Sequence, residues 1–259
     1  RLDQTIQAKG GKTEKVELDK DYLKGYITDT KSILTSPLHW QKSDWMKASL
    51  VVGITLGLYA CDENTQDWVQ ENRNDNSDDI AKFAKIFGDG KYTLPPLAGL
   101  FLYGHFSENS KARRVALLSL ESYVVSGFFT LSIKFAGHRH RPGEADSPYV
   151  WDGPGLYKEN QSFPSGHAQS AFSIATVIAS EYSDIEVIPP LAYGLATLTA
   201  LSRVNDDAHW SSDVFFSSAL SYFTAKAIIR RHKKDKGNNI IVLPLIDSKY
   251  TGLLLSYQF

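Results

Sequence analysis

The sequence predicts an all-α protein, a bundle of about six helices with a polar N-terminal arm and a short extended C-terminal tail. Hydrophobic residues make up 42% of the 259 residues, which is typical of a globular chain that can bury one sizeable core. Apolar residues recur at three- and four-residue intervals, as at Leu117, Leu120, Val124 and Phe128, and this is the period of a helix. Strand patterns are weak before the tail.

The N-terminal third begins with a polar segment over residues 1–30, in which no hydrophobic period is sustained. We expect this segment to form an arm. Ser43 and Asp44 are typical of a helix cap and predict a helix over about 45–61. Residues 62–79 then carry seven acidic side chains against Arg73. A calcium loop would need a glycine at its turn, so this stretch is predicted to be a solvated helix or loop.

The remaining helices are predicted at about 94–105, 111–135, 166–182, 190–201 and 210–231. The tail, "NNIIVLPLIDSKYTGLLLSYQF", has short apolar runs broken by Pro244 and Gly252, which predicts a hairpin or an extended segment packed on the bundle. The expected organisation is an arm over 1–30, a helical domain over 31–236 and the tail over 237–259.

The composition excludes several classes of function. The 28 basic and 29 acidic side chains give a net charge of −1, so the chain offers no electrostatic reason to bind nucleic acid. The single cysteine, Cys61, excludes an internal disulfide and any zinc or iron–sulfur site built from cysteines.

The apolar runs are short for a membrane protein. A spanning helix needs about 20 mostly apolar residues, and the uncharged runs over 48–61, 92–107 and 187–202 fall short of that length. The run over 115–133 is long enough, but Glu121 interrupts it. With a mean hydropathy of −0.25, we expect a soluble or peripheral protein rather than an integral one.

Three polar stretches carry candidate chemistry. The first, "KFAGHRHRP", has Lys134 at the end of a long apolar helix and Arg141 seven residues later, before a proline. A helix end that turns into such a loop can bring both cations to one point. Taken alone, cations that offset a helix dipole explain this stretch equally well.

The second stretch, "SFPSGHAQSAF", introduces a helix with Ser165, Gly166 and His167. The backbone N–H groups at a helix start are unsatisfied and bind phosphate oxygens, and glycine lets the anion approach closely. The alternative is a serine-capped helix with an incidental histidine.

The third stretch, "SRVNDDAHWSSD", contains Arg203, His209 and Asp213. If a helix begins at Trp210, the four-residue spacing puts the histidine and the aspartate on one face, where the carboxylate can fix the tautomer of the imidazole. Arg203 can grip two phosphate oxygens with its planar fork. The alternative is a surface ion pair beside a helix end.

Together the stretches supply the parts of a phosphoryl-transfer site, and the chain resembles the type 2 phosphatidic acid phosphatase (PAP2) superfamily, which includes bacterial class A acid phosphatases and vanadium haloperoxidases. The signature of that superfamily is Lys, six residues, Arg-Pro; then Pro-Ser-Gly-His; then Ser-Arg, five residues, His, three residues, Asp. The chain matches it in order at Lys134 and Arg141-Pro142, at 164–167, and at Ser202-Arg203, His209 and Asp213.

The resemblance implies a role for each matching residue. Lys134, Arg141 and Arg203 would hold the phosphate oxygens, assisted by Ser165 and the backbone N–H of Gly166. His209 would form a phosphohistidine, oriented by Asp213. His167 would act first as general acid for the leaving group and then as general base for water. The cations supply the positive charge, so no metal or other cofactor is implied.

The resemblance also implies a substrate class and a location. The substrate would be a phosphate monoester on a lipid or on a small organic molecule, and lipid pyrophosphates also fall within the superfamily. The location would be the bacterial cell envelope, in the periplasm, with the protein either soluble or in peripheral contact with the membrane. The oligomeric state stays open.

Two other functions remain open. A vanadium haloperoxidase would bind vanadate in the same pocket, with His209 as the vanadium ligand. A non-catalytic protein that binds phosphate or lipid would need only the cations, whereas this chain also offers a nucleophile, an orienting acid and a general acid.

The other polar residues have plainer interpretations. His138 and His140 are expected to be solvated or structural, and the pair Asp206 and Asp207 is expected to form a turn rather than a magnesium site. Trp40 and Trp45 are expected in the core, with a membrane interface as the alternative. The basic cluster over 230–234 is either a helix-end charge group or an anchor to anionic lipid.

Overall fold

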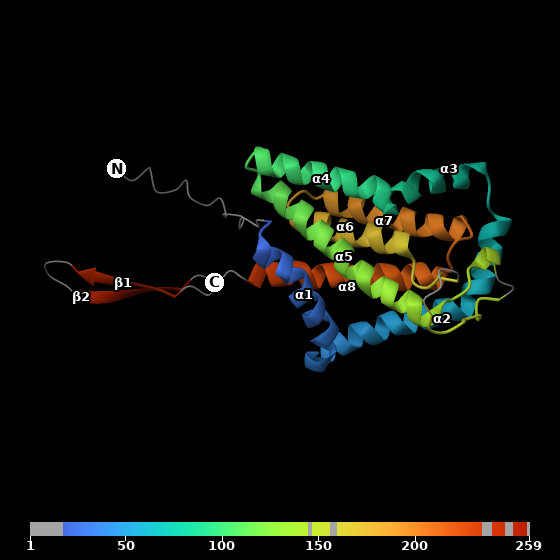
Figure 1. Ribbon diagram of the computed structural model, residues 1–259, viewed down its shortest axis with the longest axis horizontal. Coiled ribbons are helices and arrows are strands. Elements are labelled where there is room, and N and C mark those ends of the chain that lie inside the picture. The colour runs from blue at the N-terminus through green and yellow to red at the C-terminus, as the bar shows by residue number, and fades with distance from the viewer. Residues whose placement is uncertain (1–17, 145–146, 156–159, 235–239, 247–250, 258–259) are drawn as a thin grey trace.

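Eight α-helices form a bundle in the computed structural model, which describes residues 18–144, 147–155, 160–234, 240–246 and 251–257 (Figure 1). They are α1 (Lys20–Thr35), α2 (Lys42–Glu71), α3 (Asp75–Ala84), α4 (Gly90–Phe106), α5 (Ser110–Gly137), α6 (Gly166–Glu181), α7 (Ile188–Asn205) and α8 (Ser211–Lys234). Three short 3₁₀ helices join them: η1 (Ser36–His39), η2 (Lys85–Gly88) and η3 (Pro142–Glu144).

Helix α6 lies at the centre of the bundle and packs against α5, α7 and α8. Helix α4 lies along α5, α3 along α7, and α2 along α8, so that the outer helices surround the central four (Figure 1). One core cluster, formed by Val115, Leu118, Val125, Val177 and Ile228 with their neighbours, joins α5, α6 and α8.

The interior of the bundle is lined largely by small side chains. On α5 the buried face continues through a row of hydroxyl residues that ends at Lys134: Ser119, Ser122, Ser126 and Thr130. On α6 most of the buried residues are alanine, serine or threonine. Small residues let helix backbones approach closely, as they do where helices pack inside a membrane.

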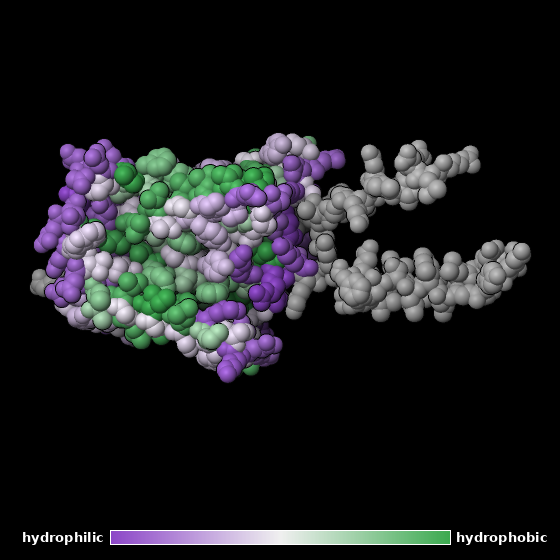
Figure 2. Space-filling view, turned by 180° about the vertical axis from the view of Figure 1, so that it is seen from behind, coloured by the Kyte–Doolittle hydropathy of each residue, from purple (hydrophilic) through white to green (hydrophobic). Residues whose placement is uncertain are grey.

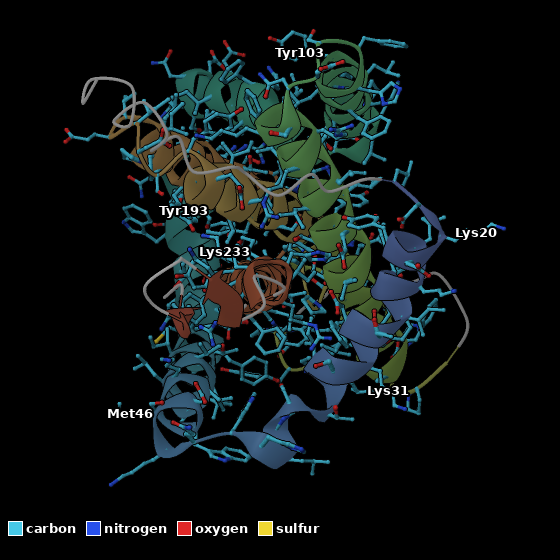
Figure 3. All side chains as sticks on the ribbon, turned by 90° about the vertical axis from the view of Figure 1, so that its left-hand side faces the viewer. Lys20, Lys31, Met46, Tyr103, Tyr193 and Lys233 are labelled. Atoms are coloured by element: carbon cyan, nitrogen blue, oxygen red, sulfur yellow. The ribbon has the colours of Figure 1, made fainter. Side chains whose placement is uncertain are left out.

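The large apolar side chains lie instead on the outside, and we call this surface the apolar belt. Figure 2 shows hydrophobic residues between hydrophilic ends of the bundle. In the view along the bundle in Figure 3, Met46 and Tyr103 lie at the periphery, where they are 68% and 55% exposed. The belt includes Leu50, Val52, Ile54 and Leu56 on α2, Leu102 on α4, Leu120, Val124, Phe128 and Leu131 on α5, and Leu198 and Leu201 on α7.

The apolar period read from α5 therefore marks the outer face and not the core. Of its four residues, Leu117 is buried, whereas Leu120, Val124 and Phe128 are 38%, 45% and 53% exposed. Helix α5 is also long and apolar enough to cross a membrane by length and composition, and half of its most apolar window is buried inside the protein.

The all-α prediction is confirmed, with eight helices in the described residues rather than about six. Helix α1 lies partly in the segment predicted to be an arm, so the boundary expected at residue 30 falls inside a helix. The Asp19 side chain caps α1, and the hydroxyl of the buried Tyr22 donates to Glu121 Oε2 at 2.8 Å. This partner lies 99 residues away, so nothing local in the sequence indicates that α1 is anchored.

The acidic stretch over 62–79 is helical apart from its centre, because α2 continues to Glu71 and α3 begins at Asp75. Gln41, not Ser43, caps α2, through a reciprocal capping box with Asp44. The expectation of a solvated segment is wrong at Asp62, whose side chain is fully buried. The other five predicted helices are present with ends within four residues of the predicted ones.

The C-terminal tail forms an antiparallel hairpin of β1 (Ile240–Ile246) and β2 (Thr251–Tyr257). Ile240 pairs with Tyr257, and Ile246 pairs with Thr251. The expected boundary at 236, like the predicted arm up to residue 17, lies outside the described residues.

Candidate active site

The three polar stretches meet at one end of the bundle, where α5 and α7 end and α6 and α8 begin (Figure 1). Direct contacts join them. The Ser165 N–H donates to the Asp213 carbonyl at 3.3 Å, which joins the second stretch to the third. Arg139, inside the first stretch, donates from Nη1 to Asp213 Oδ1 at 2.5 Å. The structure thus brings together the residues that the sequence analysis selected.

Two cations come from the first stretch. Lys134 is 8% exposed and donates from Nζ to the Gln161 carbonyl. Arg141 is partly buried. Burial lowers the pKa of His209 and of Arg203, and the positive charge of Arg141 adds to both shifts. Buried cations in one place favour a bound anion, since its charge would offset their mutual repulsion.

The nitrogen atoms of the Arg203 guanidinium differ in their hydrogen bonding. Its Nη1 donates to Asp206 Oδ2 at 2.8 Å. Its buried Nε has no hydrogen-bond partner among the described residues. A buried donor without a partner costs free energy, so this N–H is suited to a ligand oxygen that would complete it.

The start of α6 offers further donors. The fully buried Ser165 caps the helix by accepting from the Ala168 N–H. Gly166 has open space where a Cβ would lie. As the first helical residue it has no carbonyl partner within the helix for its N–H, so an anion can reach it.

His209 lies just before α8, and Ser162 lies between it and Asp213. The distance from His209 Nδ1 to Asp213 Oδ2 is 3.7 Å, which is too long for a direct hydrogen bond. The Ser162 hydroxyl donates to Asp213 Oδ2 at 2.5 Å and lies 3.4 Å from His209 Nδ1. The Trp210 N–H also donates to Asp213 Oδ2. Asp213 therefore faces the Nδ1 side of the ring and leaves Nε2 on the opposite side.

The protonation states of the two histidines follow from their surroundings. Burial lowers the pKa of His209 to about 4, although Asp213 opposes the shift. Burial and the charge of Arg203 lower the pKa of His167 to about 4 as well. At neutral pH both imidazoles are thus uncharged, and each keeps a ring nitrogen with a lone pair.

Four residues at the site were missed by the sequence analysis: Asp62, Gly88, Ser162 and Arg139. Gly88, at the end of η2, lies so close to α6 that a Cβ there would be 2.6 Å from the His167 carbonyl oxygen. Arg139 and Asp62 form a fully buried ion pair at 2.8 Å. Arg139 stood inside the first stretch and could have been noticed as a third cation, but Asp62 and Gly88 had no local signal.

The histidines beside Arg139 have structural contacts. His138 is fully buried and ends α5 in the left-handed conformation, with φ of 45°. His140 lies 3.0 Å from Asp152. Asp206 and Asp207 form the predicted turn. Trp45 is 53% exposed and contacts Trp40 edge to face, so the core expectation for this tryptophan is wrong.

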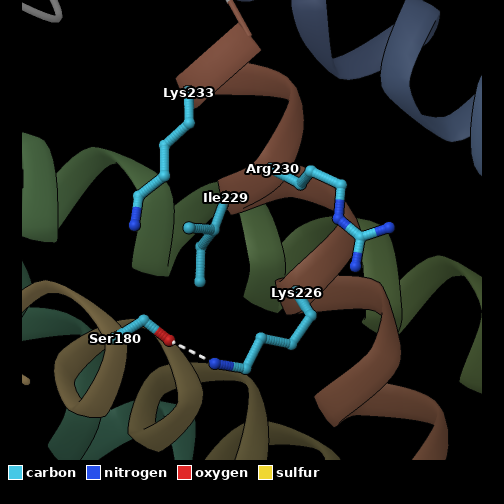
Figure 4. Close-up of a pocket in the computed structure, with 5 residues that line it drawn as sticks. All are labelled: Ser180, Lys226, Ile229, Arg230 and Lys233. Carbon is cyan, nitrogen blue, oxygen red and sulfur yellow. Dashed lines mark hydrogen bonds between the residues drawn. The ribbon is translucent and has the colours of Figure 1, made fainter. Parts of the chain in front are cut away.

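A second basic pocket, of about 310 Å³, lies near the other end of α8 (Figure 4). Lys226, Arg230 and Lys233 line it together with Ser180, whose hydroxyl accepts from Lys226 Nζ at 2.8 Å. It contains none of the residues of the three stretches and is separate from the candidate active site.

The three stretches lie in a region that is similar to a known protein family. The sequence model of the PAP2 superfamily matches residues 115–236, which include all three stretches. The chain carries a PAP2 superfamily domain. Its sequence is 38% identical over 60 residues to the lipid A 1-phosphatase of Porphyromonas gingivalis, which is 23% of this chain and 14% of that protein's length.

Two solved structures share the fold of the PAP2 domain. The transmembrane PAP2-type phosphatidylglycerolphosphate phosphatase from Bacillus subtilis superposes with a TM-score of 0.51 at 17% identity, over 85% of this chain and 98% of its own. Aquifex aeolicus LpxE superposes with a TM-score of 0.52 at 20% identity, over 65% of this chain and 94% of its own. At these identities the likeness shows the helical fold alone.

Proposed function

We propose that this protein is a metal-independent phosphatase that hydrolyses phosphate monoesters of lipids through a phosphohistidine. The observation that carries the proposal is the buried His209, uncharged and oriented by Asp213 and Ser162, close to Arg203, whose buried Nε has no hydrogen-bond partner among the described residues. A protein that only binds phosphate needs only the cations, whereas nucleophilic attack also needs an oriented, neutral imidazole.

In the first step, His209 Nε2 attacks phosphorus and the bond from phosphorus to the alcohol oxygen breaks. His167 donates a proton to that oxygen, and the substrate leaves as an alcohol. Lys134, Arg141, Arg203 and the amide of Gly166 hold the three non-bridging oxygens, where negative charge accumulates.

In the second step, the now neutral His167 removes a proton from water, and the water oxygen attacks phosphorus. The bond from phosphorus to nitrogen breaks, which releases inorganic phosphate and restores His209. Asp213 stabilises the positive charge that the imidazole carries while it is phosphorylated.

A lipid substrate is supported by the apolar belt. Exposed apolar surface of this extent indicates a membrane or a protein partner. Helix α5, at 28 residues, is about 42 Å long, which exceeds the 30 Å or so of bilayer hydrocarbon. We place the belt within the bilayer and the active site at its surface, in the cell envelope. This proposal departs from the expectation of a soluble or peripheral protein.

Phosphate release tests both parts of the proposal. The purified protein should hydrolyse phosphatidic acid, phosphatidylglycerol phosphate or a lipid A phosphate in mixed micelles faster than p-nitrophenyl phosphate. His209→Ala should abolish turnover and leave phosphate binding measurable. Release from membranes without detergent would contradict the bilayer placement, and unchanged hydrolysis by His209→Ala would contradict the mechanism.

A further inference from the structure

Two fully buried residues that are not among the fixed positions of the signature, Asp62 and Arg139, form a chain of charges that ends on the carboxylate of Asp213. Asp62 belongs to α2, and Arg139 lies in the loop after α5. Asp213 lies in the first turn of α8. The three side chains alternate in sign, and none of them reaches solvent.

The guanidinium of Arg139 is fixed on every side. Its Nη1 donates to Asp213 Oδ1 at 2.5 Å, and its Nη2 donates to Asp62 Oδ2 at 2.8 Å. Nε and Nη2 both donate to the Pro148 carbonyl. The ring of Tyr59 lies 4.7 Å from Cζ and covers one face of the guanidinium.

Asp62 is fixed in turn by the start of α8. Its Oδ1 accepts from the Ser212 N–H at 2.9 Å and from the Ser211 hydroxyl at 2.6 Å. The Ser212 hydroxyl donates to Oδ2. Helix α2 thereby holds the first turn of α8, which carries Asp213, at the end where His209 lies.

The two carboxylate oxygens of Asp213 therefore have different partners. Oδ1 is bound by Arg139, so Oδ2 stays directed towards Ser162 and the Nδ1 side of His209. The charges matter too. Arg139 alone would cancel the charge of Asp213, but Asp62 neutralises Arg139, so a net negative charge remains to stabilise the phosphorylated imidazole.

We propose that Asp62 and Arg139 are positioning residues for phosphoryl transfer to His209, acting through the orientation and charge of Asp213. This inference rests on the proposed phosphohistidine mechanism. The simpler alternative is a buried ion pair that only stabilises the fold, and it predicts lower stability without any effect on the chemical step.

Rapid-quench kinetics on the full chain distinguishes the positioning role from a purely structural ion pair. In Asp62→Asn and Arg139→Gln, the rate of phosphohistidine formation from p-nitrophenyl phosphate should fall about 10- to 100-fold, because small misplacements of reacting groups cost that much. The affinity for inorganic phosphate should stay within about twofold, since Lys134, Arg141 and Arg203 are intact. The double variant should be no slower than Arg139→Gln, because Asp62 acts through Arg139.

A matched control is available at the opposite end of the bundle. Arg114 and Glu181 form another buried pair at 3.1 Å, with side chains 5% and 7% exposed. Arg114→Gln should lower the melting temperature and leave the rate of phosphohistidine formation unchanged. If Arg139→Gln does not fold, Arg139→Lys keeps the charge but cannot reach both carboxylates, and its rate should fall in the same way.

Wild-type rates of phosphohistidine formation in the folded Asp62 and Arg139 variants would overturn the positioning role. With His209→Ala inactive in the same assay, that result would leave the proposed function standing. Failure to detect a phosphohistidine in the wild-type protein would instead overturn the proposed mechanism itself.

Discussion

Arg203, in the last turn of α7, forms an ion pair with Asp206, the residue that ends this helix, with 2.8 Å between Nη1 and Oδ2. The same carboxylate oxygen lies 3.4 Å from Lys85 Nζ in η2. Asp206 binds Nη1 of the Arg203 guanidinium, whereas the buried Nε has no hydrogen-bond partner among the described residues. Asp206 thus positions Arg203, which we propose to hold phosphate. Gln66 Nε2 fixes the turn by donating to Asp207 Oδ1 at 2.6 Å.

Asp206→Ala should therefore raise KM. Hydrogen bonds to charged groups contribute about 1.5–3 kcal/mol when buried, and partial exposure of this pair reduces that value. We expect KM for p-nitrophenyl phosphate to rise roughly 3- to 10-fold with a smaller change in kcat. Asp184→Ala, which removes an exposed ion pair with Lys111, is the control and should leave KM unchanged. An unaltered KM in Asp206→Ala would show that Arg203 does not need this partner.

Gly88→Ala should displace His167. The added Cβ would lie 2.6 Å from both the His167 carbonyl oxygen and Thr199 Cγ2, where no real Cβ fits. Overpacking of this kind costs about 1–3 kcal/mol of folding free energy. Since the start of α6 would have to move, we expect kcat to fall at least about tenfold.

Gly99→Ala on α4 is the matched control, because nothing lies within 4 Å of its Cβ position. Its melting temperature and kcat should stay at or above the wild-type values. If Gly88→Ala keeps the wild-type kcat while losing stability, the close approach of η2 serves packing and not the site.

The pKa of His167 should rise when phosphate binds. Burial and the charge of Arg203 hold it at about 4, so the imidazole is neutral at pH 7 and is too weak an acid to protonate the leaving group. A bound phosphate brings negative charge next to the ring, which favours the protonated form. NMR titration of ¹⁵N-labelled histidine with and without orthovanadate measures the change. A pKa that stays near 4 in the complex would remove His167 as the general acid.

The acid limb of kcat/KM reports on His209. The nucleophile must be neutral, and its pKa is lowered to about 4. The acid limb should thus be centred near pH 4, where activity is lost as His209 gains a proton. A limb centred near 6.5, the pKa of an exposed histidine, would indicate that His209 is not buried as described.

The candidate site could be predicted from the sequence because its residues lie in three local patterns with fixed spacing. The residues that surround the site could not be predicted in this way. Asp62, Gly88 and Gln66 reach the site from helices and turns more than 70 residues away along the chain, and their contacts depend on the packing of α2 and η2 against α7 and α8.

The apolar outer face of α5 was missed for a related reason. Glu121 was taken as a charged interruption of an apolar run, but its side chain is fully buried and bonded to Tyr22 and His232. A charge that is paired inside the bundle does not prevent the outer face of the same helix from being apolar. Length and charge along the sequence cannot separate the two faces of α5, whereas the structure does.

The attachment of helix α1 to the bundle should weaken as pH rises through about 9. Asp29 accepts from Arg231 Nε, and His232, in the last turn of α8, lies 3.0 Å from Glu121 Oε2 and 3.5 Å from Asp29 Oδ2. Burial lowers the pKa of His232, but the hydrogen bonds to Asp29 and Glu121 outweigh it and raise the pKa to about 9.

Because the pKa of His232 is higher in the folded state than its unfolded value of about 6.5, the protonated imidazole stabilises the fold below pH 6.5 and this stabilisation is lost as pH rises through 9. With partial solvent screening we expect it to amount to about 1–2 kcal/mol. Hydrogen exchange of the α1 amides, corrected for the intrinsic rate, should show protection falling between pH 7 and pH 10. His232→Gln should remove this pH dependence, whereas His105→Gln on α4 should keep it. Protection that is independent of pH in the wild-type protein would mean that Tyr22 and Arg231 anchor α1 without the charge of His232.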